Sequence, residues 1–190
     1  MAYITTNELR AHLGYRPEFV EDDVQIAAAI AAAEAMLDDY CGRTFSVDTV
    51  ATARTYELCT LPLTVEDVST TTGVVVAHST DRLTFTTLDA TTYFFEPTKT
   101  GWPATTWQAL TSPGAGWLRV TALHGWTAVP EPVTAATKLV AAQLLARRHS
   151  PNGIEMSWEG GAIRASRYLD GHAELMLRPY RRVEAFAGIA

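Results

Sequence analysis

The sequence has no long hydrophobic run, and this absence excludes a membrane-spanning helix from the prediction. No apolar stretch in its 190 residues approaches the ~18–20 residues that cross a bilayer. The first residues, MAYITTNELR, contain neither a basic nor an apolar region, so we expect no signal peptide. We therefore expect a soluble protein without a membrane partner, long enough to bury a hydrophobic core.

Basic charge is also scarce. Fifteen Lys and Arg residues stand against 21 Asp and Glu residues, which gives a formal net charge of −6. A protein that grips nucleic acid over its whole surface needs clustered Lys and Arg to neutralise phosphates. The charge argues against such a protein, but it allows DNA to pass nearby.

Cysteine is nearly absent. The chain has two cysteines, Cys41 and Cys59, and they do not form a CxxC motif. This spacing gives little support for a metal or redox site. We expect two buried thiols in a reducing compartment.

Signatures of catalysis and metal binding are missing. There is no G-x-S-x-G elbow and no GxxxxGK[ST] loop, and the five histidines show no HExxH spacing. The pairs Asp22/Asp23 and Asp38/Asp39 occupy adjacent helical positions, which point about 100° apart. Their carboxylates do not converge as an acid–base pair. We expect no catalytic residue, no metal ligand, no cofactor and no enzymatic activity.

Two helices are predicted at the N-terminal end. Thr5 and Glu8 form a T-x-x-E capping box for the first helix, and Gly14 supplies its left-handed stop. The second helix begins near Asp22 and ends at Gly42. Its core-facing stripe repeats at intervals of four and three, at Ile26, Ile30, Ala33, Leu37 and Tyr40.

The opposite face of the second helix consists mostly of alanine. Its candidates for contact with another subunit are Ala28, Ala31, Ala32 and Ala35. Alanine has the highest helix propensity, so an inert, solvent-exposed face is one interpretation. Alanine also lets another backbone approach closely, so contact with a helix or a second subunit is the other. Both interpretations stay open at this point.

From residue 45 to residue 126 the composition shifts to threonine, valine and aromatic residues, and helical periodicity disappears. Turn signals such as HSTD and SPGAG separate short segments of β-type composition. Strands are predicted at Thr52–Leu58, Val74–His78, Leu83–Thr87, Thr91–Glu96 and Trp117–His124. These strands predict a small antiparallel sheet inserted between helices.

Helical patterns return after this region. A third helix has Pro132 in its first turn, and a short fourth helix, GHAELMLRPYRR, ends at Pro179. We predict an α+β fold with a helical bundle of about four helices. The helical core comprises residues 1–44 and 127–177, the β-rich insertion residues 45–126, and an extended C-terminal tail residues 178–190.

The tail contains the one local basic cluster, RPYRR. Arginine and tyrosine are enriched at the energetic centres of interfaces, so this cluster is a candidate binding segment. A solvated terminus is the other interpretation. The residues concerned are Arg178, Tyr180, Arg181, Arg182 and, by extension, Phe186.

The order of these pieces resembles the head-to-tail connector, or adaptor, proteins of long-tailed bacteriophages. The resemblance rests on YITTNELRAHLGY followed by EDDVQIAAAIAAAEAMLDDYCGRTF, on WLRVTALHGWTAVPEPVTAATKLVAAQLLARR, and on LRPYRR. These segments lie toward both ends of the chain. The β insertion is larger and richer in threonine than helical members of the family would need, and its role is unassigned.

The resemblance implies a structural virion protein of the neck, made in the host cytoplasm. Such adaptors form a ring, usually dodecameric, below the portal protein, extend the DNA channel, and bind a stopper or tail-completion protein. DNA would pass through the lumen without specific binding. By position, the portal-binding candidates are the RPYRR residues and Phe186. Alternatives are a stopper or tail-terminator protein of the same neck, a small hydrolase, and a non-viral β-sheet binding module.

Overall fold

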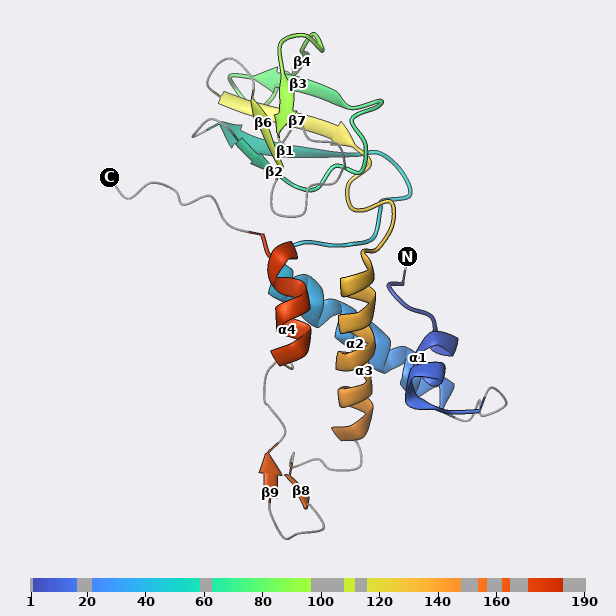
Figure 1. Cartoon of the computed structure of the whole chain (residues 1–190). Helices are drawn as coiled ribbons and strands as arrows, with labels where there is room; N and C mark the ends of the chain where they lie inside the picture. Colours follow the sequence, from blue (N-terminus) through green and yellow to red (C-terminus); the bar gives the residue numbers. More distant parts are fainter. Residues whose placement is uncertain are drawn as a thin grey trace. The chain divides into compact units, whose positions relative to one another are not determined.

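The structure is a computed structural model that describes residues 2–16, 22–58, 63–96, 108–111, 116–147, 154–156, 162–164 and 171–182. These residues form four α-helices and three small antiparallel sheets (Figure 1). The α+β class predicted from the sequence is confirmed.

The chain divides into two compact units. The helical unit comprises Met1–Cys41 and Val129–Pro179, and the sheet unit comprises Gly42–Ala128 and Tyr180–Ala190. The sequence predicts a helical core of residues 1–44 and 127–177 and a β-rich insertion of residues 45–126. It assigned all of residues 178–190 to a separate tail, whereas the structure groups Tyr180 with the sheet unit. Positions 183–190 of that tail lie outside the described residues.

The first helix, α1 (Thr6–Leu13), has the ends that its sequence predicts. The backbone N–H of Glu8 donates to Thr5 Oγ1 at 3.2 Å, and the N–H of Thr5 donates to Glu8 Oε2 at 2.6 Å. This reciprocal pair satisfies two of the donors that a helix N-terminus leaves free. At the other end Gly14 adopts φ +72°, and its N–H bonds the carbonyl of Ala11 at 3.2 Å.

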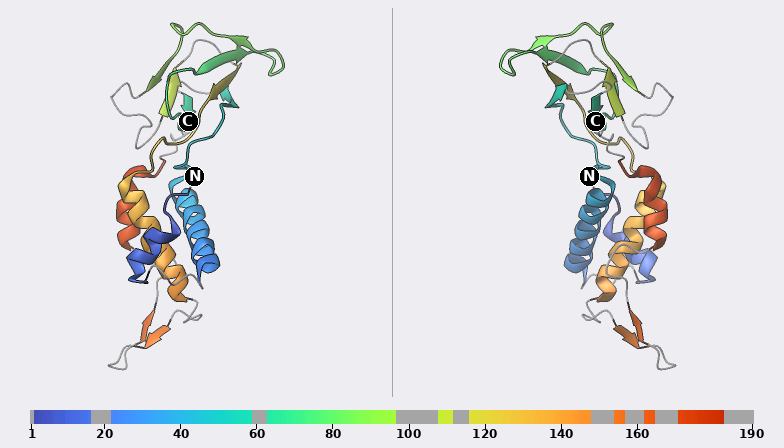
Figure 2. Two further views of the ribbon diagram at one scale, coloured as in Figure 1. Left: turned by 90° about the vertical axis from the view of Figure 1, so that its right-hand side faces the viewer. Right: turned by 90° about the vertical axis from the view of Figure 1, so that its left-hand side faces the viewer.

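The helical unit is organised around α2 (Asp23–Cys41), which packs on α1 and α3, while α3 packs on α4. Figures 1 and 2 show α2 and α3 side by side from several directions. The remaining helical segments are α3 (Glu131–Arg147), α4 (Gly171–Leu177) and a 3-10 turn, η1 (Arg178–Tyr180). The predicted stripe of α2 is buried at Ile26, Ile30, Ala33 and Leu37, and Tyr40 is half-buried.

Two sheets share the core of the sheet unit. The larger has the strand order β1-β7-β3-β4 and contains β1 (Thr52–Leu58), β7 (Gly116–Ala122), β3 (Val75–Ser79) and β4 (Thr86–Thr87). The smaller has the order β2-β6-β5 and contains β2 (Leu63–Val65), β6 (Gln108–Thr111) and β5 (Phe94–Glu96). Inward side chains from both sheets meet in one apolar cluster that includes Val65, Val76, Leu118 and Val120.

The side chains of β7, an interior strand of the larger sheet, alternate between the two faces of that sheet. Leu118, Val120 and Ala122 are buried, while Trp117, Arg119 and Thr121 alternate with them on the other side. This period-two pattern is the one expected of a strand with one face in a core. A third sheet, in the helical unit, pairs β8 (Ile154–Met156) with β9 (Ala162–Arg164).

Candidate functional site

The alanine face, defined as Ala28, Ala31, Ala32 and Ala35, is exposed along α2. Alanines elsewhere on the same helix, Ala29 and Ala33, are buried. The structure therefore brings the four predicted subunit-contact residues together on one open face. Val24 continues this face toward the N-terminus and is 82% exposed.

An acidic cluster lies at the C-terminal end of the alanine face. Tyr3 donates its hydroxyl to Asp38 Oδ1 at 2.5 Å and its backbone N–H to Glu34 Oε1 at 2.6 Å. Burial raises the pKa of Asp38 to about 6, against the opposing effect of the Tyr3 hydrogen bond, and the charge of Glu34 adds to the rise. Asp39, the next residue, is exposed.

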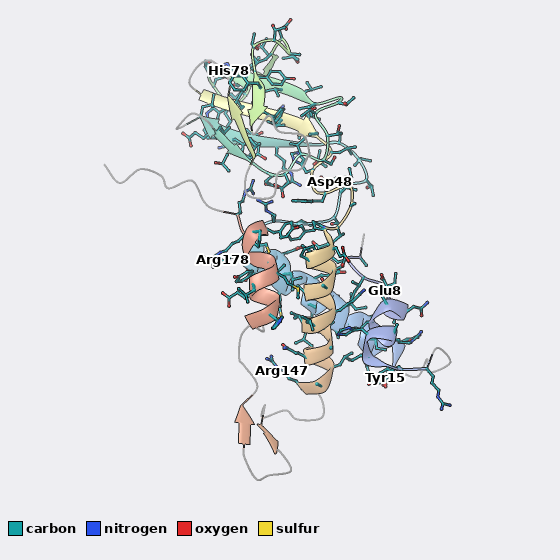
Figure 3. The ribbon with its side chains drawn as sticks, viewed as in Figure 1. Glu8, Tyr15, Asp48, His78, Arg147 and Arg178 are labelled. Atoms are coloured by element: carbon teal, nitrogen blue, oxygen red, sulfur yellow. The ribbon has the colours of Figure 1, made fainter. Side chains whose placement is uncertain are left out.

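The predicted portal-binding residues are divided between two environments. Tyr180 packs edge-on against Phe45 and Trp126, with ring centroids 6.0 and 5.9 Å apart, and Arg182 donates to the carbonyl of Val65. These two residues are held in the sheet unit. Arg178 and Arg181 are exposed, and Figure 3 labels Arg178 at the end of α4. Phe186 lies outside the described residues.

Tyr180 packs on Trp126, and Trp126 is hydrogen-bonded to a buried carboxylate, Asp67, that sequence reasoning missed. Trp126 donates its indole N–H to Asp67 Oδ2 at 2.9 Å, and Arg43 Nε lies 3.6 Å from the same oxygen. Arg43 and Asp67 are almost fully buried, and Phe45 packs on Trp126 with centroids 5.6 Å apart. No local motif links residues so far apart in the sequence.

Sequence reasoning also missed the outer face of the larger sheet. There the guanidinium carbon of Arg82 lies 4.4 Å from the ring centroid of Trp117, and that of Arg119 lies 3.7 Å from the centroid of Phe85. Both distances are within the range of cation–π attraction. We call this surface the outer sheet face; its residues are Ala53, Thr55, Glu57, Val75, Ala77, Phe85, Thr87, Trp117, Arg119 and Thr121.

The loop that carries Arg82 is held by its neighbour Asp81. Asp81 Oδ1 accepts hydrogen bonds from the backbone N–H of Thr84 and of Leu83, both at 2.9 Å, and from the Ser79 hydroxyl at 2.8 Å. These bonds, led by the one from Thr84, lower the pKa of Asp81 to about 2. Arg82 itself takes φ +64°, a conformation that few non-glycine residues adopt. The loop thereby fixes Arg82 beside Trp117.

The described residues include no group of three or more His, Cys, Asp or Glu side chains placed to hold a metal ion. A cavity of about 260 Å³ lies among α1, α2 and α3, and of the described residues that line it only Asp22 and Tyr15 have polar side chains. None of the helices in the described part of the chain is both long enough and apolar enough to span a membrane.

His124 is a buried histidine in the sheet unit. Burial lowers the pKa of its imidazole, and the charge of Arg54 adds to the effect. The residue is 2% exposed and has no neighbouring nucleophile in the described contacts that it could activate. We assign it to the core.

Comparison with known proteins finds a solved structure of similar fold. No protein-family model and no curated protein matches the sequence. A solved structure described as the "neck of empty GTA particle computed with C6 symmetry" matches 98% of this chain and 93% of its own, with a TM-score of 0.58. The chain shares the fold of that neck structure. Sequence identity between the two is 17%, so the likeness concerns the fold alone.

Proposed function

We propose that the chain is a structural protein in the neck of a phage-like particle, where it serves as a head-to-tail adaptor. The observation that carries this proposal is the fold match over nearly the whole chain to a structure from the neck of a GTA (gene transfer agent) particle. The resemblance of the N- and C-terminal segments to phage connector proteins supports it independently. The role is mechanical and requires no catalytic residue and no cofactor.

In this role the chain forms a ring beneath the portal protein, and a stopper or tail-completion protein binds below. The related neck structure was computed with C6 symmetry, which agrees with a six-fold or a twelve-fold ring, the dodecamer included. The net charge of −6 suits a lumen through which DNA slides without specific binding, because like charge repels phosphate. Tight binding of duplex DNA at physiological salt would argue against this lumen.

Location in a particle tests the role directly. A chain carrying a gold-binding tag is produced in cells that make the particles, and the particles are imaged by electron microscopy. Label at the junction of head and tail is the expected result. Particles that consistently lack the chain, or carry it on the capsid or the tail tip, would contradict the proposal.

The alanine face is the proposed subunit contact. Ala31→Glu places a charge at its centre, where burial against a neighbour would cost several kcal/mol. We expect this variant to lose ring formation and to keep its helical circular dichroism. Ala11→Glu, at an exposed alanine of α1, is the matched control and should assemble normally. A ring that still forms in the Ala31→Glu variant would exclude this face.

The C-terminal segment is the proposed portal contact. Tyr180 and Arg182 fix the segment to the sheet unit, and the exposed Arg178 and Arg181 offer charge to the portal, with Phe186 beyond them. Replacing both exposed arginines by glutamate should weaken binding to a portal ring at least tenfold and leave the mass of the free chain unchanged. Unaltered portal affinity would remove these arginines from the contact.

A further inference from the structure

The outer sheet face and the loop beside it carry two arginines, Arg119 and Arg82, whose described partners are aromatic rings alone. Elsewhere in the sheet unit Arg43 lies beside Asp67, and Arg54 forms ion pairs with Asp48 and Glu66. Among the described residues no carboxylate forms an ion pair with Arg82 or Arg119. Stacking on a ring leaves the N–H edge of a guanidinium available, and that edge matches a carboxylate in two-point geometry.

These two arginines belong to one open surface. Trp117, which Arg82 covers, and Arg119 are two residues apart on β7, so their side chains leave the sheet about 6–7 Å apart. Around them the side chains are small or exposed, at Ala53, Thr55, Glu57, Val75, Ala77 and Thr87. Tryptophan and arginine are among the residue types that dominate binding energy at protein interfaces.

A ring gives this surface a partner of defined kind. Subunits in a cyclic ring with more than two members meet head to tail, so each interface joins two different surfaces of the same chain. If the alanine face is one of them, a second, dissimilar surface has to receive it. The outer sheet face is a dissimilar surface of the same chain, and the short side chains of the alanine face let the backbone of α2 approach it closely.

The charges of the two surfaces are complementary. Two aspartates, Asp38 and Asp39, stand at the C-terminal end of the alanine face, and Glu34 adds a third carboxylate. No cation among the described residues forms an ion pair with any of the three. The outer sheet face carries one carboxylate of its own, Glu57, opposite Trp117 on β1, so the complementarity rests on the two arginines and the carboxylates of α2.

We propose that α2 of one copy docks its alanine face on the outer sheet face of the next copy, with Arg82 and Arg119 receiving the aspartates at its C-terminal end. The proposal rests on the ring of the proposed function. It gives the sheet unit a purpose: this unit supplies the receiving surface for the neighbouring subunit. Asp39, which is exposed and makes no described side-chain bond, is the carboxylate best placed to pair without breaking a contact within its own chain.

Charge reversal on the full chain tests this pairing. Asp39→Arg should abolish self-association because the introduced arginine would meet Arg119 of the next copy. Arg119→Glu should abolish it because the introduced glutamate would meet Asp39. An equimolar mixture should associate again when the two variants alternate around the ring. At one interface the introduced arginine then meets the introduced glutamate, and at the other the unchanged Asp39 meets the unchanged Arg119. Light scattering over a range of concentrations up to the solubility limit measures the masses.

The expected result is two monomeric variants whose mixture recovers wild-type mass, with the two chains in equal amounts. Arg16→Glu, which makes the same charge change at an exposed position of the helical unit, is the control and should associate like the wild type. The proposal is overturned by variants that still associate alone, by a mixture that stays monomeric, or by a wild-type chain that is monomeric at every concentration. The gold-label experiment locates the chain in the particle independently of the contact between subunits. Label at the neck would therefore support the neck role even if the pairing of α2 with the outer sheet face failed its test.

Discussion

At the scale of single residues, Asp67 joins groups that lie far apart in the sequence. Its carboxylate accepts the indole N–H of Trp126 and lies beside Arg43, and its backbone carbonyl accepts the N–H of Gly125 at 2.8 Å. Gly125 has φ +96°, and a Cβ there would lie 1.9 Å from the carbonyl oxygen of Ser46. Only glycine fits this close approach. The Gly-Trp pair before α3 thus has a structural reason: glycine permits the approach, and tryptophan donates to one oxygen of a buried carboxylate.

Removing the indole N–H should destabilise the sheet unit. Trp126→Phe leaves Asp67 with one buried oxygen that has lost its donor, which costs about 1–3 kcal/mol. Urea unfolding followed by fluorescence and circular dichroism measures the change. Trp117→Phe, on the outer sheet face, is the comparison and should cost less than about 1 kcal/mol, because it alters only a cation–π contact. Equal losses from both substitutions would contradict the role of Asp67.

The pKa of Asp38 makes stability depend on pH in a defined direction. The folded value of about 6 lies above the ordinary 3.8, so the folded chain binds more protons between these values. The contribution of Asp38 to the free energy of unfolding should therefore fall as pH rises from about 4 to about 6, and be constant above. Asp38→Asn keeps an acceptor for Tyr3 and should remove this fall, as measured by urea unfolding at several pH values. Asp39→Asn, the exposed neighbour, should leave it in place. A fall that persists in the Asp38→Asn variant would contradict the assignment.

At the scale of elements, the helices were predictable and several strands were not. Thr5, Glu8 and Gly14 carry local capping chemistry, so the sequence alone determined both ends of α1. Strand β1 was also placed correctly, because seven residues of β-type composition are bounded by turns. The prediction missed β2 and β6, which have three and four residues, since pairing with distant strands rather than local composition makes them strands. Strands β4 and β5 came out shorter than predicted for the same reason.

The capping box of α1 gives a quantitative test at this scale. Thr5→Ala removes the acceptor for the N–H of Glu8 and should cost about 1 kcal/mol in the free energy of unfolding. The pKa of Glu8 should rise only part of the way to its ordinary value, since the backbone N–H of Thr5, the larger cause of the low pKa, still donates while the Thr5 hydroxyl bond is lost. Urea unfolding and NMR titration of Glu8 measure the two effects. Thr6→Ala, one position into the helix, is the control; if it costs as much as Thr5→Ala, the box is not the cause.

At the scale of the whole molecule, the candidate site was predictable only in part. The alanine face could be found from the sequence because helical periodicity assigns every residue of α2 to a side. The outer sheet face could not, because Arg82 reaches Trp117 across a hairpin loop and Arg119 reaches Phe85 across strands. The placement of Tyr180 was also beyond the sequence, since its partners Phe45 and Trp126 lie more than fifty residues away. Contacts between distant segments depend on the fold, which local patterns do not encode.

The proposed adaptor role depends on assembly of the chain with a portal. The most direct measurement is the molar mass of the full chain by light scattering, alone and mixed with a portal ring from the same source. The proposed adaptor role predicts a portal-bound species whose mass has increased by a full ring of chains. It also predicts that Ala31→Glu prevents this increase in mass. A chain that keeps the mass of a single subunit in the presence of the portal would contradict the central claim.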